Sequence, residues 1–123
     1  MPNSTFWLVE GDQLIAVANL RHRLNRHLRQ HGGHIGYGVR PSWRGRGNGT
    51  LLLRRTLEEA RRRRIRRVLI TCAKDNVASA GVARANGGVL TNEHWHSAEE
   101  PSRPGYLEQH YWIDLRAGGG AGR

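Results

Sequence analysis

The sequence predicts an α+β domain in which a mixed β-sheet is flanked by helices. Short apolar runs of strand length alternate with two segments of helical periodicity. The chain has 123 residues, enough for one domain with a single core. It contains no apolar run of about 18 residues, so no membrane-spanning helix is expected. We therefore expect one domain over residues 1–115, followed by a disordered Gly/Ala-rich tail over residues 116–123.

The first elements predicted are a β-hairpin and a third strand. Residues 6–9 form a strand-like run, residues 10–13 a turn, and residues 14–20 the second strand of the hairpin. A polar connection over residues 26–33 leads to a third apolar run over residues 34–39. This arrangement predicts an antiparallel half of the sheet at the start of the chain.

A loop rich in arginine and glycine follows the third strand and opens onto a helix. It reads Arg44-Gly45-Arg46-Gly47-Asn48-Gly49-Thr50. Its glycines let the backbone curl so that N–H groups point inward, and the helix start adds unpaired donors and the positive dipole end. The loop therefore predicts a phosphate-binding site. It is neither a Walker loop nor a dinucleotide fingerprint, and a plain Gly-rich turn or a nucleic-acid-binding segment remains an alternative.

The second half of the chain predicts two helices and three strands. Residues 48–64 place three apolar side chains on one helical face, and residues 68–72 have the composition of a buried parallel strand. Residues 76–85 form a second helix that ends at an Asn-Gly-Gly sequence. A strand begins at residue 89, residues 98–105 form a loop, and residues 109–115 complete the sheet. The three apolar residues of the first helix are Leu53, Leu57 and Ala60.

The formal net charge of +10 comes almost entirely from arginine. It is compatible with a nucleic-acid partner, with an anionic small molecule, or with the codon usage of a GC-rich genome, and charge alone does not decide among them. The densest basic run, residues 61–64, lies at a helix C-terminus, where positive charge is favourable. Because that position accounts for the run, nucleic acid is not the partner we expect.

Cysteine and histidine usage gives little support for a disulfide or a metal site. The single cysteine, Cys72, excludes an internal disulfide, fits a reducing cytoplasm, and is expected to be an inert core residue. His94 and His96 share a strand face, and His110 lies on a later strand. No other ligands with zinc spacing accompany them, so no metal site is expected.

Several of these motifs, in this order, resemble the GNAT superfamily of N-acetyltransferases. The glycine loop is similar to its acyl-CoA signature, Arg/Gln-x-x-Gly-x-Gly/Ala. The other matching segments are Val39-x-Pro41, Val68-Leu69-Ile70-Thr71-Cys72, Asp75-Asn76-x-Ala78-Ser79 and Asn86-Gly87-Gly88. The resemblance covers nearly all of residues 5–115 and implies a GNAT-like acyl-CoA N-acyltransferase fold.

The resemblance implies that acetyl-CoA donates an acetyl group to a small-molecule or peptide amine by direct attack. The backbone of Tyr37, Gly38 and Val39 would pair with pantetheine. The pyrophosphate would be bound by Arg44, Gly45, Arg46, Gly47, Asn48, Gly49 and Thr50, and the cofactor arm by Asn76 and Ser79. Helix capping explains Asn76 equally well. The alternatives are a basic nucleic-acid-binding module and a catalytically degenerate CoA-binding GNAT domain.

The residues that move protons are less well indicated. His34 is near the position of a glutamate in several GNAT enzymes and is the first candidate base, and His22 is the second. A histidine on a strand also commonly has a structural role. Many members carry a tyrosine acid at the position that is Ala83 here, so Tyr37, Tyr106 or Tyr111 would have to replace it, or the thiolate would leave through solvent.

The beginning of the chain departs from the family pattern. A full GNAT member starts with a strand and two helices that this sequence does not show. Without them a sheet edge and part of the core would be uncovered. We therefore expect a second subunit to cover this region in a homodimer; the alternative is that the recorded start codon lies too far downstream.

Overall fold

The computed structural model describes residues 3–26, 33–96 and 104–116. The predicted order of strands and helices is confirmed, with a short 3-10 helix added before the first α-helix. The predictions for residues 27–32, 97–103 and 117–123, including most of the tail, lie outside the described residues. The elements are β1 (Asn3–Glu10), β2 (Gln13–Arg21), β3 (Ile35–Val39), η1 (Pro41–Trp43), α2 (Asn48–Arg62), β4 (Arg67–Ala73), α3 (Val77–Ala85), β5 (Val89–His96) and β6 (Tyr106–Asp114).

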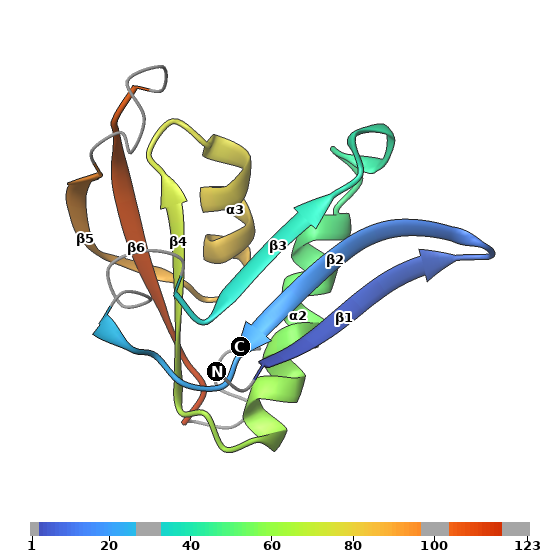
Figure 1. Ribbon diagram of the computed structural model, residues 1–123, viewed down its shortest axis with the longest axis horizontal. Coiled ribbons are helices and arrows are strands. Elements are labelled where there is room, and N and C mark those ends of the chain that lie inside the picture. The colour runs from blue at the N-terminus through green and yellow to red at the C-terminus, as the bar shows by residue number, and fades with distance from the viewer. Residues whose placement is uncertain (1–2, 27–32, 97–103, 117–123) are drawn as a thin grey trace.

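The strands form two antiparallel sheets that diverge from each other. One sheet has the order β1-β2-β3 and the other the order β4-β6-β5. Figure 1 shows β3 and β4 running in a similar direction and spreading apart along their length. They meet near the start of β3, where the backbone N–H of His34 donates to the carbonyl oxygen of Leu69 at 2.8 Å. The α+β class is confirmed, and the two sheets form the sides of a V.

The strand predicted over residues 68–72 is buried as expected, but it pairs with its neighbour in an antiparallel and not a parallel direction. Val68, Leu69 and Ile70 are each at most 1% exposed. The β4 ladder is antiparallel, with β6. The N–H of Leu69 donates to Nδ1 of His34 at 2.9 Å instead of to a backbone carbonyl of β3. The imidazole of His34 thereby accepts the hydrogen bond that the N–H of Leu69 would otherwise donate to β3 in a parallel ladder. Strands β3 and β4 therefore separate after this contact.

The two helices close the core between the sheets. Leu53, Leu57 and Ala60 of α2 are buried, as their spacing predicts. Helix α2 contacts β2 and β3, and α3 contacts α2, β4 and β6. Fully buried side chains from both sheets, including Ile35 and Tyr111, join the helices in one cluster. This packing holds the starts of α2 and α3 near the diverging ends of β3 and β4.

The first sheet exposes apolar side chains. Trp7 is 69% exposed, and its partner across the ladder, Val17, is 37% exposed. Val9, two residues along the same strand, is 56% exposed. These three side chains form an apolar surface on one face of the sheet. Within the described part of the chain, no helix is both long and apolar enough to cross a membrane.

Candidate functional site

A pocket of about 470 Å³ lies where β3, the glycine loop and the first turns of α2 and α3 come together. All but one of the twelve residues predicted to bind the cofactor line it, the exception being Arg46. Three other lining residues, Trp43, Ala78 and Val82, were not among the predicted cofactor-binding residues. The predicted residues that line it are Tyr37, Gly38, Val39, Arg44, Gly45, Gly47, Asn48, Gly49, Thr50, Asn76 and Ser79.

The glycine loop presents a row of backbone donors to the pocket. Gly45 and Gly47 have φ angles of 76° and 81°, a left-handed conformation that a side chain would strain. Gly47 is the N-cap of α2 and offers no side chain to the first turn. Within the described part of the chain, the N–H groups of residues 45–50 have no hydrogen-bond acceptor. Together with the positive end of the α2 dipole, these donors suit a multiply charged anion.

Side chains of the loop hold its backbone in place. Nε of Arg44 donates to the carbonyl oxygen of Val39 at 3.0 Å, and Nδ2 of Asn48 donates to that of Trp43, also at 3.0 Å. The guanidinium of Arg46 lies over the Trp43 ring at 5.0 Å from its centroid. Arg46 therefore supports the pocket through Trp43, which lines it, and adds positive charge nearby.

Helix α3 begins on the other side of the pocket. Oδ1 of Asn76 accepts a hydrogen bond from the N–H of Ser79 at 3.1 Å, so Asn76 caps α3 and also lines the pocket. Burial of Tyr37 raises the pKa of its phenol above the usual 10.0, although the hydrogen bond with Ser79 acts in the opposite direction. Tyr37 therefore carries its proton at neutral pH.

Cys72, Tyr106 and Tyr111 are not among the residues that line the pocket. Cys72 is buried in the core, and burial raises the pKa of its thiol, which favours the inert role expected from the sequence. Tyr111 is fully buried and donates to Oε1 of Gln109, while Tyr106 donates to Oε2 of Glu108. Of the three tyrosines in the chain, Tyr37 alone is among the pocket residues.

His34 and His22, the two candidate bases, are not among the pocket residues. His34 is 7% exposed, and its Nδ1 accepts the N–H of Leu69. In the neutral tautomer the proton then lies on Nε2, so neither ring nitrogen is available as a base without breaking this bond. His22 Nε2 lies 2.9 Å from Oγ of Ser4. The geometry favours a structural role for His34.

Comparison with known proteins identifies related sequences and folds. The sequence model of a family described as "Acetyltransferase (GNAT) family" matches residues 1–87. A search of curated proteins found no significant match.

Among solved structures, three similar chains are informative. YncA from Salmonella typhimurium, solved with acetyl-CoA, has a TM-score of 0.70 and 21% identity over 85% of this chain and 60% of its own. A ribosomal-protein-alanine N-acetyltransferase from Brucella melitensis has a TM-score of 0.75 and 21% identity over 90% of this chain and 68% of its own. RimL, a ribosomal L7/L12 protein acetyltransferase solved with coenzyme A, has a TM-score of 0.73 and 24% identity over 94% of this chain and 63% of its own. These likenesses show the fold, and the chain spans 60% to 68% of the lengths of these three proteins.

Proposed function

The chain belongs to the GNAT acetyltransferase family, and we propose that it transfers the acetyl group of acetyl-CoA to an amine by direct attack. The observation that carries this proposal is the row of N–H donors over residues 45–50 at the positive end of α2. A diphosphate requires several converging donors, and this loop supplies them without a side-chain cap that would compete. The residues present therefore fit coenzyme A.

Strand β3 is proposed to bind the pantetheine part of the coenzyme. It is an edge strand, paired with β2 on one side only, and Tyr37, Gly38 and Val39 line the pocket. Backbone amides at an unpaired edge are available to a ligand. Acetyl-CoA supplies the activated thioester. A backbone N–H that polarises its carbonyl contributes about 3 to 4 kcal/mol in comparable enzymes.

Tyr37 is proposed to supply a proton to the leaving thiolate. Its hydroxyl lies in the pocket wall, is held by Ser79, and stays protonated because burial raises its pKa. The residue at the position usual for this acid is Ala83, which is completely buried in the core. Tyr37 lines the pocket from β3, whereas Ala83 on α3 does not.

The acceptor is proposed to be a small-molecule or peptide amine. The net charge of +10 disfavours a strongly cationic acceptor such as a polyamine. We take residues 1–115 as the catalytic domain. A cytoplasmic location is proposed because the single cysteine is free and therefore suits a reducing compartment. Cell fractionation tests the location directly.

Calorimetry with acetyl-CoA, followed by thiol release over a panel of amines, tests the function. Saturable binding at one acetyl-CoA per chain with amine-dependent thiol release is expected. Binding without release from any amine would indicate the degenerate CoA-binding domain. If coenzyme A has no effect and the protein instead binds duplex DNA with a steep salt dependence, the nucleic-acid-binding alternative is correct.

We also propose that a second copy of the chain covers the apolar face of the first sheet. Trp7, Val9 and Val17 form this face, and exposed apolar patches of this kind commonly mark protein interfaces. Sedimentation velocity should show a dimer that Trp7→Lys converts to a monomer. Val89→Lys, a change at a position of similar exposure on β5, is the matched control and should leave the dimer intact. A monodisperse, stable wild-type monomer would refute the proposal.

A further inference from the structure

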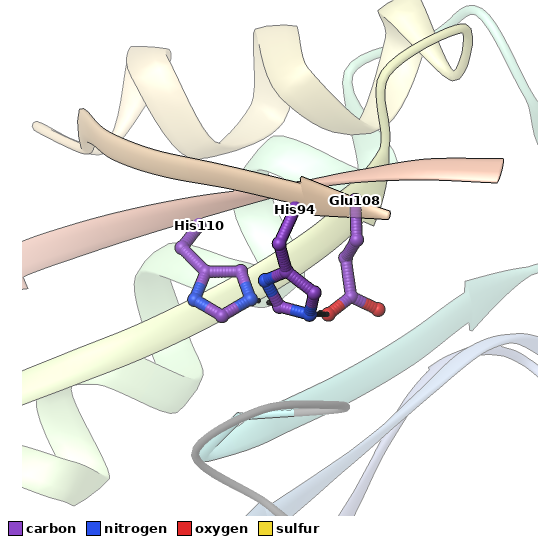
Figure 2. Close-up of side chains that lie close together, drawn as sticks. All are labelled: His94, Glu108 and His110. Atoms are coloured by element: carbon purple, nitrogen blue, oxygen red, sulfur yellow. Dashed lines mark hydrogen bonds and ion pairs between the residues drawn. The ribbon is translucent and has the colours of Figure 1, made fainter. Parts of the chain in front are cut away.

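Three metal-ligating side chains converge on the sheet formed by β4, β6 and β5. His94 lies on β5, and Glu108 and His110 lie two residues apart on β6. In the ladder His94 is directly opposite Glu108, and His110 is opposite Asn92. Alternation along a strand places Glu108 and His110 on one face of the sheet. Figure 2 shows all three side chains extending from β5 and β6 toward one another.

The nitrogens of both histidines approach the same carboxylate oxygen. Nε2 of His110 lies 3.1 Å from Oε1 of Glu108, and Nε2 of His94 lies 3.7 Å from it. The two imidazole rings are 4.6 Å apart between centroids and nearly perpendicular, at 81°. One ligand atom from each residue lies within 4.8 Å of the other two.

These separations suit a tetrahedral zinc site. Zinc bonds to histidine nitrogen and to carboxylate oxygen are about 2.0 to 2.2 Å long, so the ligand atoms of a tetrahedral ion are about 3.3 Å apart. The two nitrogen–oxygen distances lie on either side of this value, and the shorter one is a hydrogen bond that the ion would replace. The three ligand atoms lie within 4.8 Å of one another, so they would move closer together on binding zinc. Two histidines and one glutamate are also a donor set of known zinc enzymes, in which water occupies the fourth position.

We propose that His94, Glu108 and His110 bind one divalent transition-metal ion of the zinc type. The carboxylate neutralises part of the charge of the cation. The imidazoles provide nitrogen ligands, which suit zinc better than they suit magnesium or calcium. Oxygen-binding cations are disfavoured because they need six or more oxygen ligands. The site joins β5, the edge strand of its sheet, to β6.

The surroundings of the cluster support binding. The side chains of Glu108 and His110 are 4% and 8% exposed, whereas that of His94 is 31% exposed. An ion can therefore reach the cluster from the side of His94. The hydroxyl of Tyr106 donates to Oε2 of Glu108 at 3.3 Å and so orients the carboxylate while leaving Oε1 directed at the histidines.

The site is separate from the pocket described above. None of the three residues lines that pocket. Gln109 and Tyr111, the residues that alternate with Glu108 and His110 along β6, face the other side of the sheet. On that side Tyr111 belongs to the core that contains Ala80 and Ala83 of α3. The metal and the coenzyme can therefore be bound independently, and metal binding can be measured whether or not the chain transfers acetyl groups.

Tag-free protein, first treated with a chelator and then titrated with Zn²⁺ alone, tests the proposal. Wild type should bind one Zn²⁺ per chain, and its Tm should rise by about 10 °C at metal concentrations about 100 times the Kd. Co²⁺ at the same site should give the visible absorption bands of tetrahedral coordination. Glu108→Gln and His94→Gln should each weaken Zn²⁺ binding at least tenfold and abolish the Co²⁺ bands.

The matched control is Glu93→Gln. Glu93 is adjacent to His94 on β5 and contacts Gln109, so its substitution removes a carboxylate from the same pair of strands without touching the cluster. Its zinc affinity should equal that of wild type. His94→Gln keeps the test decisive if Glu108→Gln fails to fold, because His94 is partly exposed. The proposal is wrong if wild type binds no Zn²⁺, or if Glu108→Gln or His94→Gln binds it as tightly as Glu93→Gln.

Discussion

The hydroxyl of Tyr37 lies 3.0 Å from Oγ of Ser79, linking β3 to the first turn of α3 across the pocket. These residues are 42 positions apart in the chain, and both line the pocket. The contact places a protonated phenol beside the glycine loop, in a domain where the position usual for a tyrosine acid is occupied by Ala83.

Substitution of Tyr37 by phenylalanine should reduce kcat while leaving the Kd of acetyl-CoA almost unchanged. A general acid contributes about 100- to 10,000-fold, so a loss of about 100-fold is expected at neutral pH. Because burial raises the pKa of Tyr37, its proton is retained through neutral pH. The wild-type rate should therefore show no decline from this group as the pH rises through neutral. A kcat for Tyr37→Phe within threefold of wild type would exclude Tyr37 as the acid.

Substitution of Gly47 by glutamate should abolish acetyl-CoA binding in calorimetry. The new carboxylate would lie among the backbone donors of the loop, and the left-handed φ of 81° would be strained by any side chain. Gly11→Ala is the matched control, because Gly11 has a φ of 61° and open space around its Cβ position but lies in the β1–β2 turn. The Gly11→Ala variant should lose about as much stability as Gly47→Glu and should still bind acetyl-CoA normally. Unchanged affinity in Gly47→Glu would show that the loop does not bind the diphosphate.

Substitution of His34 by leucine should reduce stability more than catalysis. The N–H of Leu69 would lose its acceptor Nδ1 in a buried position, which costs about 1 to 3 kcal/mol of unfolding free energy in urea denaturation. The value of kcat for folded protein should remain within a few-fold of wild type. A fall of 100-fold or more in kcat, with loss of the acidic limb of the pH–rate profile, would instead identify His34 as the general base.

The carboxyl of Asp114 should titrate at an unusually low pH. Two nitrogens of the Arg116 guanidinium and the Arg116 backbone N–H donate to this carboxylate, and they lower its pKa from 3.8 to about 2. A depressed pKa in the folded state means that the pair stabilises the fold above about pH 4 and stops doing so as the pH falls through about 2. In an NMR titration Arg116→Gln should move the pKa back toward 3.8. An unchanged value in this variant would contradict the assignment.

Local sequence was sufficient to predict the order of elements and most of the residues that line the pocket. The glycines at 45, 47 and 49, the following helix and the capping Asn76 act over a few residues, so their spacing shows directly where the backbone curls and where helices begin. For the same reason the buried face of α2 was predictable from Leu53, Leu57 and Ala60. The contact of Arg46 with Trp43 was not predictable, because it depends on how a side chain packs within the folded loop.

The amino-acid sequence alone determined that a strand leads into a glycine-rich loop and a helix, since those features depend on neighbouring residues. Tertiary structure decided which distant side chains meet: Tyr37 with Ser79, His34 with Leu69, and His94 with Glu108 and His110. These contacts depend on the register between strands and on the angle at which the two sheets diverge. A one-residue shift in the pairing of β5 with β6 would turn His94 to the opposite face, and spacing along one strand contains no information about that register.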